Sequence, residues 1–395
     1  MAQSLRTVLL AALFWLGSAS GQHHHAGHGA ASAGRAAELG AMAAIDAQGI
    51  LWAAHKEGGH VLVSRSGDFG RSWSNPTRVT VEAEGTDPSG EARPKVATGN
   101  DGELYVTWTR PLGKRHIGEI RFSRSIDGGQ TFSKPLTVHA DRQEIAHGFD
   151  AIAVNRSGQI FVAWIDARDR TAASAAQARD YRGAAVYFAV SDDRGASFRG
   201  DYKLAEHSCE CCRIALSPRD DGSVLVLWRH VFAPNIRDHA LAAMHPDGRA
   251  GAVQRATFDD WRIDACPHHG PSLAQDAQDR LHAVWFTQAP ERSGVFYGRL
   301  RAGGVDAERR VGGDAAEHAD LALMGKRVAV AWKEFDGERS QLRAMVSEDG
   351  GDNWQERALA ATSGASDQPR VLAWKDRFYV FWNTRNEPLS VKELP

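Results

Sequence analysis

The chain has 395 residues, of which 43% are hydrophobic and 24% are charged. This composition is ordinary for a folded globular protein, and the 39 glycines indicate many tight turns. Lys and Arg number 47 against 49 Asp and Glu, so the chain lacks the basic excess that favours nucleic acid or an anionic membrane surface as a partner.

The N-terminus predicts export. Arg6 precedes an apolar run over residues 8–16, and small residues occupy 17–21, which is the order of a secretory signal peptide. We therefore predict a signal peptide over residues 1–21 and a periplasmic or secreted mature protein. The apolar run is shorter than the roughly 20 residues that a membrane helix needs, and no later run reaches that length, so we expect no transmembrane span.

Residues 22–37 form a predicted flexible segment that begins with histidines. Cleavage after residue 20 makes His23 the third residue of the mature chain, and cleavage after residue 21 gives that place to His24. A free amine, two backbone amides and an imidazole then offer square-planar nitrogens that suit Cu(II) or Ni(II). The alternative is a tail that binds no metal.

A repeat extends over residues 38–395 and predicts one all-β domain. A short apolar strand ending in tryptophan occurs seven times, at Trp52, Trp108, Trp164, Trp228, Trp285, Trp332 and Trp382. Each is flanked by further short apolar segments between Gly, Asn and Asp turns, which is the strand pattern. About four strands per repeat of ~50 residues predicts a seven-bladed β-propeller. The last repeat is one strand short, so we expect the N-terminal segment to complete it.

Four turns carry a second motif, Ser-x-Asp-x-Gly-x-(Ser/Thr)-aromatic. They begin at Ser66, Ser125, Ser191 and Ser347, and the last has Asn353 at the Ser/Thr position. The motif resembles the Asp box, or bacterial neuraminidase repeat, of the sialidase-like propellers. The resemblance implies that each Asp caps its own turn, that the Gly has a positive φ and that the aromatic side chain packs between blades, away from the active face. It also makes six blades an alternative, because sialidases have six.

Charged residues recur where the innermost strands begin, at positions that face the central channel. Alignment of these strands predicts a set of ligand-binding side chains, Arg93, Asp150, Arg213, Asp320 and Arg370, with Lys95 beside them. The three arginines could clamp the carboxylate of a small molecule or carbohydrate, since arginine offers forked donors. The alternative is that the channel charges satisfy one another.

The sialidase resemblance implies a catalytic set that the sequence does not complete. Such an enzyme needs three carboxylate-binding arginines, a tyrosine nucleophile with a glutamate, and an acid/base aspartate. The Phe/Tyr-Arg-Ile-Pro motif that carries the first arginine is absent. Tyr105 and Tyr379 fall on predicted second strands, and Tyr181, in the insertion over residues 166–182, is the one loop candidate. Catalytic residues therefore stay unassigned.

Cysteines and histidines precede or open several innermost strands. We expect them to meet at one mouth of the channel: Cys209, Cys211, Cys212, Cys266, His268, His269, His147 and His318. One interpretation is structural, with Cys266 in a disulfide to a cysteine of blade four and the other two paired locally. The other is a soft-metal site, for which Cu(I) is apt because sulfur ligands select it. One disulfide plus a histidine site is a third outcome, and the spacing matches no zinc ribbon.

These patterns predict an exported, monomeric propeller that binds a ligand at its channel mouth. Copper held by the Cys/His cluster is the first hypothesis. An exo-sialidase or related glycoside hydrolase acting on acidic sugars is the second, motivated by the Asp boxes and the channel arginines. A non-catalytic protein-binding scaffold is the third, and whether the protein is an enzyme stays open.

Overall fold

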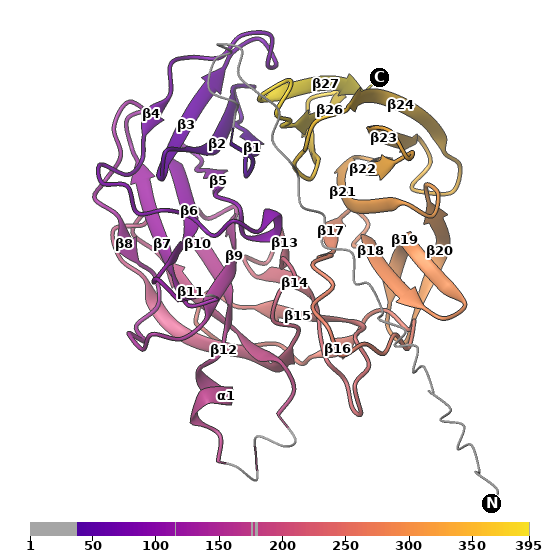
Figure 1. Cartoon of the computed structure of the whole chain (residues 1–395), viewed down its shortest axis with the longest axis horizontal. Coiled ribbons are helices and arrows are strands. Elements are labelled where there is room, and N and C mark those ends of the chain that lie inside the picture. Colours follow the sequence, from indigo (N-terminus) through magenta and orange to yellow (C-terminus); the bar gives the residue numbers. More distant parts are fainter. Residues whose placement is uncertain (1–37, 115, 175–176, 178–180, 395) are drawn as a thin grey trace, which may run out of the picture. The chain divides into compact units, whose positions relative to one another are not determined.

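Seven antiparallel sheets are arranged as blades around a common axis (Figure 1). The structure is a computed structural model that describes residues 38–114, 116–174, 177 and 181–394. The predicted signal peptide and the histidines His23 and His24 lie outside these residues. No helix within the described ranges is long and apolar enough to cross a membrane.

Each blade is a meander in which strands adjacent in sequence pair with each other. Blade one contains β1 (Met42–Ile45), β2 (Leu51–Glu57), β3 (His60–Ser66) and β4 (Thr77–Arg78). The one-turn helix η1 (Gly90–Ala92) precedes blade two, which contains β5 (Lys95–Thr98), β6 (Leu104–Pro111), β7 (Gly118–Ser125) and β8 (Leu136–Thr137). Blade three contains β9 (His147–Val154), β10 (Ile160–Asp166), the short helix α1 (Arg168–Ala172), β11 (Ala184–Ser191) and β12 (Arg199–Ser208).

The remaining four blades follow the same pattern. Blade four contains β13 (Ala215–Pro218), β14 (Val224–Arg229), β15 (His239–Met244) and β16 (Gln254–Arg255), and blade five contains β17 (Ser272–Gln275), β18 (Leu281–Ala289), β19 (Arg292–Arg301) and β20 (Gly304–Val311). Blade six contains β21 (Ala316–Met324), β22 (Arg327–Phe335), β23 (Ser340–Ser347) and β24 (Gln355–Thr362), and blade seven contains β25 (Arg370–Trp374), β26 (Arg377–Trp382) and β27 (Ser390–Leu394). Seven blades are thus confirmed over the six-bladed alternative.

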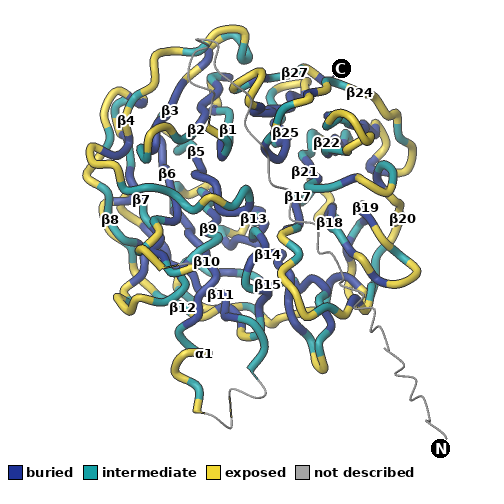
Figure 2. The backbone as a smooth tube through the Cα atoms, in the orientation of Figure 1, coloured by how far each residue is buried: buried dark blue, intermediate teal, exposed yellow. Residues whose placement is uncertain are grey.

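The tryptophan repeat forms the hydrophobic core between blades. Each of the seven tryptophans lies on the second strand of its blade, and all are buried. Figure 2 shows buried residues along the strands and exposed residues along the outer turns. The indole N–H groups find acceptors in several blades: that of Trp52 donates to Asp46 at 2.8 Å and that of Trp332 to Glu334 at 3.0 Å. One large buried indole therefore repeats in each blade, as the sequence predicts, although the N–H groups of Trp108 and Trp228 have no acceptor among the described residues.

The Asp boxes form the turns between third and fourth strands and fasten one blade to the next. In blade three, Ser197 N–H donates to Asp193 Oδ1 at 2.9 Å, and its hydroxyl donates to Oδ2. Gly195 has φ +77° and lies against the Phe122 ring of blade two, which Phe198 meets edge-on at 4.8 Å. The capping and the packing between blades that the motif predicts are both present.

The ring closes between blades seven and one. The first strands of neighbouring blades contact one another around the axis, and β25 contacts β1. Gly40 and Ala41 donate their backbone N–H groups to the carboxylate of Asp367, at 2.8 to 2.9 Å. Among the residues that the structure describes, no fourth strand joins β27, so the expected completion of blade seven by an N-terminal strand is not observed there.

Candidate functional site

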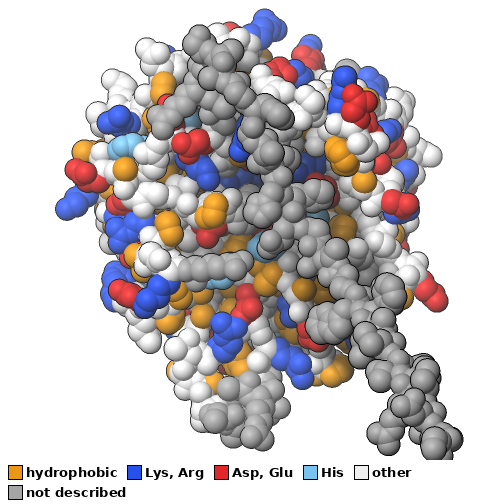
Figure 3. Space-filling view, viewed as in Figure 1, with side chains coloured by type: hydrophobic (Ala, Val, Ile, Leu, Met, Phe, Trp, Pro, Cys, Tyr) orange, Lys and Arg blue, Asp and Glu red, His pale blue; other side chains and the backbone are white. Residues whose placement is uncertain are grey.

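The site lies at one mouth of the channel and is built from the connections that lead from the outer strand of one blade to the innermost strand of the next. The propeller repeats this connection at the same end of every blade. Side chains that are 50 to 280 residues apart in the sequence therefore meet: the Glu91 carboxylate, for example, accepts a 2.6 Å hydrogen bond from Gln368, 277 residues away. Figure 3 shows histidines near the middle of one face, among hydrophobic and charged side chains.

Glu91, in η1, is the buried centre of this mouth. Its carboxylate accepts the backbone N–H of Arg213 at 2.8 Å and of Gly270 at 3.0 Å, and it contacts His318 Nδ1 at 3.2 Å. Burial alone would raise the pKa of Glu91, but the Arg213 guanidinium and His318 hold it well below its usual range. An ionised glutamate therefore links blades two, four, five, six and seven.

The predicted channel charges contact one another. Arg213 donates to Glu91, to Gln368 Oε1 at 3.0 Å and to the backbone of blades five and six. Arg93, which is buried, donates to the Gln368 carbonyl at 2.6 Å. Arg370 donates to the Asp320 carboxylate, so all three arginines of the predicted clamp donate to protein acceptors.

The other channel charges form two ion pairs. Lys95 Nζ lies 3.5 Å from Asp150 Oδ1, and Arg370 Nη1 lies 3.1 Å from Asp320 Oδ1. Lys95, Arg370 and Asp320 line a channel cavity of about 470 Å³ together with Arg93 and Arg213, whereas Asp150 is fully buried beneath it. Ligand binding by this set stays a prediction. Lys95, Arg213 and Arg370 each form an ion pair with a carboxylate of the protein, as in the alternative in which the channel charges satisfy one another.

The cysteine cluster lies in the connection between β12 and β13. Cys209, Cys211 and Cys212 are buried, and their Sγ atoms all lie within 4.8 Å of one another. The backbone N–H of Cys209 donates to the Arg229 carbonyl at 2.9 Å, which ties the connection to β14. Phe149 of blade three packs against the three sulfurs.

The predicted disulfides are not present. All four cysteines are free thiols, and Cys209 Sγ lies 3.8 Å from Cys211 Sγ and 3.8 Å from Cys212 Sγ. A disulfide requires about 2.05 Å between sulfurs. Cys266 is exposed and contacts Cys211 at the outer side of the cluster.

Arginines surround the sulfurs and favour a thiolate. Arg237 Nη1 donates to Cys209 Sγ at 3.4 Å. Hydrogen bonds from Cys211 and Cys212 hold the pKa of the Cys209 thiol well below its usual range despite burial, and nearby Arg229 and Arg237 lower it further. The pKa values of the other two buried thiols are raised, that of Cys211 by its hydrogen bonds to the other cysteines and that of Cys212 by burial. The metal-free cluster therefore favours one thiolate, on Cys209.

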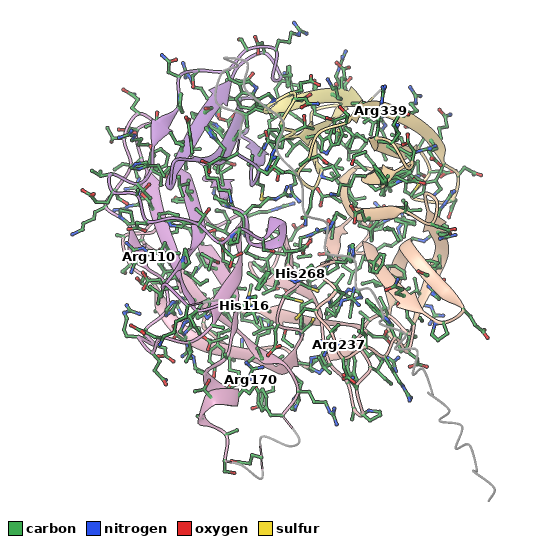
Figure 4. The ribbon with its side chains drawn as sticks, in the orientation of Figure 1. Arg110, His116, Arg170, Arg237, His268 and Arg339 are labelled. Atoms are coloured by element: carbon green, nitrogen blue, oxygen red, sulfur yellow. The ribbon has the colours of Figure 1, made fainter. Side chains whose placement is uncertain are left out.

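A pocket of about 280 Å³ opens beside the cluster. Cys211, Cys266 and His268 line it together with His116 and the largely apolar edge of blade three. Figure 4 shows His268 near the axis, with His116 and Arg170 toward blades two and three and Arg237 toward blade four. The segments near 210 and 267 thus meet at one mouth, as the blade repeat predicts.

His147 does not join the sulfurs as expected. It is buried in blade three, where its Nδ1 lies 3.1 Å from the Gly118 carbonyl and its ring stacks on His139 at 4.0 Å between centroids. It reaches only the inner wall of the 280 Å³ pocket. Its place at the start of β9 is as expected, but its side chain turns into the blade because that interior offers an acceptor and an aromatic partner.

The remaining histidines form a second group, apart from the sulfurs. His269, Glu317 and His318 have ligand atoms within 4.8 Å of one another. The single Cys/His cluster expected from sequence is therefore divided: one group of sulfurs, one group of two imidazoles and a carboxylate, and exposed His268 between the pockets that adjoin them.

Several residues of the site carry no sequence motif. Glu91, Gln368, Glu317 and Arg237 were not predicted. Glu91 and Gln368 act through partners that only the closed ring brings near, whereas Arg237 contacts Cys209 and Glu317 contacts Lys333 at short sequence separation. The positive φ of His318, 53°, accompanies a β-bulge in β21 that turns its side chain to the mouth. Tyr181, the loop tyrosine, packs its ring 5.0 Å from that of His207.

In comparisons with known proteins, the sequence matches no family model and no curated protein. Solved structures do match. The polysaccharide lyase Uly1 has a TM-score of 0.55 at 10% identity, covering 96% of this chain and 94% of that chain. An ulvan lyase of family PL25 bound to a GlcA(1-4)Rha3S ligand has a TM-score of 0.53 at 10% identity, covering 91% and 93%.

A third similar structure is an α-L-arabinofuranosidase from Fusarium graminearum, with a TM-score of 0.51 at 10% identity over 78% of this chain and 92% of that chain. At these identities the likeness shows the fold alone. The chain is a β-propeller of a kind that carbohydrate-active enzymes also adopt.

Proposed function

We propose that the protein binds one Cu(I) ion between Cys209, Cys211 and Cys212. The observation that carries the proposal is the spacing of three buried sulfurs. An ion bonded to sulfur at about 2.3 Å places its ligand sulfurs about 3.8 Å apart in a tetrahedral site and about 4.0 Å apart in a three-coordinate planar one. Both printed Sγ–Sγ distances from Cys209 are 3.8 Å.

Copper(I) suits this donor set better than zinc. Thiolate sulfur selects Cu(I), whereas structural zinc takes four ligands, and the fourth thiol here, Cys266, is exposed outside the buried trio. The guanidinium of Arg237 offsets the negative charge that three thiolates would place in a buried site. Exposed Cys266, in contact with Cys211, gives an arriving ion a first ligand. The proposed role is copper handling in the periplasm or outside the cell, where the predicted signal peptide would direct the chain.

A competition titration tests the proposal. The mature chain, kept reduced and free of oxygen, is titrated with Cu(I) buffered by bathocuproine disulfonate, with the tail histidines His23, His24, His25 and His28 replaced by asparagine. We expect one Cu(I) per chain. Cys211→Ser should weaken binding by more than the roughly 10- to 100-fold that loss of an outer partner costs, and His245→Ala, in an outer turn of blade four, should bind like the parent.

Two results would end the copper proposal. One is a parent chain that leaves all Cu(I) on the chelator, and the other is a folded Cys211→Ser variant that binds Cu(I) as tightly as the parent. Circular dichroism of each metal-free variant separates loss of the site from loss of the fold.

A second function, binding or cleavage of an acidic carbohydrate at the same mouth, is favoured by one observation. A hollow of about 340 Å³ there is lined by the polar or basic side chains of His268, His318, Lys333 and Gln368. The carboxylates of Glu91 and Asp367 also line it, but both already accept hydrogen bonds from protein donors. The folds of Uly1 and the ulvan lyase are similar, and the Asp boxes resemble those of sialidases. Binding of sialic acid by an arginine clamp is the less favoured version of this second function, since Arg93 and Arg213 already donate to protein acceptors.

A panel of uronic-acid polysaccharides and sialosides tests this second function. Release of reducing ends or of unsaturated products, lost in Lys333→Met, would support it. Inactivity and absence of binding across the panel would leave copper binding or a protein-binding scaffold.

A further inference from the structure

We propose that His269, Glu317 and His318 form a separate site for one borderline divalent cation, Zn(II), independent of the sulfur cluster. Two imidazoles and one carboxylate are the donor set of zinc centres that keep a fourth position open. The three ligand atoms already lie within 4.8 Å of one another. The proposal does not rest on copper binding, because it uses none of the cysteines.

The two imidazole rings are held in place by stacking. The His269 ring lies 4.0 Å from the Phe286 ring, at 20° between planes, and 4.5 Å from the His318 ring, at 27°. His269 precedes β17 of blade five and His318 lies at the bulge of β21 in blade six, so the closed ring sets their separation. The lone pair of a ligating imidazole nitrogen lies in the plane of its ring, so one of the two stacked rings must turn before both can bind the same ion.

Glu91 orients His318 in the way that a carboxylate hydrogen-bonded to a metal-ligating histidine does. His318 Nδ1 contacts Glu91 Oε1 at 3.2 Å, and Nε2, on the other side of the ring, lies 3.6 Å from Glu317 Oε2. A carboxylate that accepts from one ring nitrogen fixes the tautomer and leaves the lone pair of the other nitrogen toward the ion. Glu91 is itself fixed by hydrogen bonds from Arg213, Gly270 and Gln368.

His269 has a nitrogen that lacks a partner. Its Nδ1 is buried, and within the described part of the chain no hydrogen bond reaches it. A buried polar atom without a partner is costly, and a bound ion is one of the ordinary explanations.

The ammonium group of Lys333 would repel a bound cation, so removal of its charge is expected to strengthen cation binding. Its Nζ lies 3.0 Å from Glu317 Oε1, which leaves Oε2 on the histidine side. A nearby ammonium weakens cation binding by charge repulsion. Lys333 and His318 also line the hollow of about 340 Å³, so the open position of the ion would face space for a water or an anionic ligand.

The test uses Zn(II) titration against a chromophoric chelator, in a full-length mature chain that carries Cys211→Ser, Cys212→Ser and asparagine at the four tail histidines. We expect one Zn(II) per chain. His269→Ala and the milder Glu317→Gln should each lose it, Glu91→Gln should weaken it about 10- to 100-fold, and Lys333→Met should strengthen it. His245→Ala is the matched control and should change nothing.

Cobalt gives an independent readout. Co(II) in the same background should show the visible bands of a four-coordinate ion without sulfur charge-transfer bands, and these should vanish in Glu317→Gln. Absence of Zn(II) binding in the background, or a folded His269→Ala variant that binds Zn(II) like the background, would overturn the proposal. Because Cu(I) binding is measured through the cysteines, either site can fail without the other.

Discussion

Glu91 and Arg213 join blades two and four across the channel mouth. The Arg213 backbone N–H donates to Glu91 Oε2 at 2.8 Å, and its Nη1 donates to Oε1 at 3.2 Å. Both side chains are largely buried, at 1% exposure for Glu91 and 15% for Arg213. We expect Glu91→Gln to lower the free energy of unfolding by about 3 kcal/mol, the order of loss when one partner of a buried pair is removed. Guanidinium denaturation at neutral pH measures it.

The exposed pair between Arg156 and Asp220 is the control. Its side chains are 77% and 81% exposed at a separation of 2.8 Å. Asp220→Asn should change stability by less than about 1 kcal/mol because solvent screens such pairs. An equal effect of the two substitutions would contradict a structural role for the buried pair.

The Glu91 pair also predicts acid sensitivity. The folded-state pKa of Glu91 lies well below 4.5, its ordinary value, because Arg213 and His318 outweigh the effect of burial. The contribution of ionised Glu91 to the free energy of unfolding is therefore present above pH 4.5 and is lost as the pH falls toward the folded-state pKa. The stability gap between the parent and Glu91→Gln should narrow below pH 4.5; a gap that widens there would contradict the assignment.

Two buried histidines predict a second loss of stability at milder pH. Burial, together with the charge of a neighbouring histidine, lowers the pKa of both His139 and His230 from 6.5 to about 4. Between these values the unfolded chain binds protons that the folded chain does not, so stability rises with pH across this window and falls as pH drops from 6.5 to 4. Each histidine contributes about 1.4 kcal/mol per pH unit at most. Chemical denaturation at pH 7, 6, 5 and 4 checks this, and a flat profile would refute it.

A glycine of the Asp box predicts a packing effect. A Cβ at Gly195 would lie 2.4 Å from the Phe122 ring, whereas one at Gly102 would meet nothing within 4 Å. Both glycines have positive φ, 77° and 87°, so the backbone cost of alanine is similar. Gly195→Ala should therefore lower the free energy of unfolding by about 1 to 3 kcal/mol more than Gly102→Ala. Equal losses of unfolding free energy in the two variants would show that the Asp box of blade three does not pack tightly against blade two.

The four thiols should differ in reactivity. Cys266 is exposed, while the other three are buried. In the reduced, metal-free protein we expect one thiol to react rapidly with iodoacetamide, assigned by mass spectrometry to Cys266, and the remaining three only on unfolding. Rapid labelling of Cys211 or Cys212 in the folded protein would show that the cluster is open.

Much of the fold follows from the sequence because its signals are local. A tryptophan every 47 to 64 residues places one second strand in each blade, and the Asp boxes identify turns between the third and fourth strands of four blades. The meeting of the 210 and 267 segments follows from the same repeat, since successive blades present equivalent connections to one mouth.

The chemistry of the site follows less directly. Glu91 forms hydrogen bonds with residues 122, 179, 227 and 277 positions away. The sequence around Glu91 contains no signal that predicts these partners. The repeat places His147 and His318 at equivalent strand starts, yet one turns into its blade and the other to the mouth, because local acceptors and a β-bulge decide the direction of each ring. Side-chain direction therefore decides which of these histidines reaches the mouth, whereas blade position separates the sulfur group, before blade four, from the imidazole group of blades five and six.

X-ray absorption at the copper edge of the Cu(I)-loaded mature chain tests the central claim most directly. The account predicts a first shell made of sulfur, with three scatterers from the cysteines that cluster within 4.8 Å, and loss of that shell in Cys211→Ser. A first shell dominated by nitrogen or oxygen in the parent protein would contradict it.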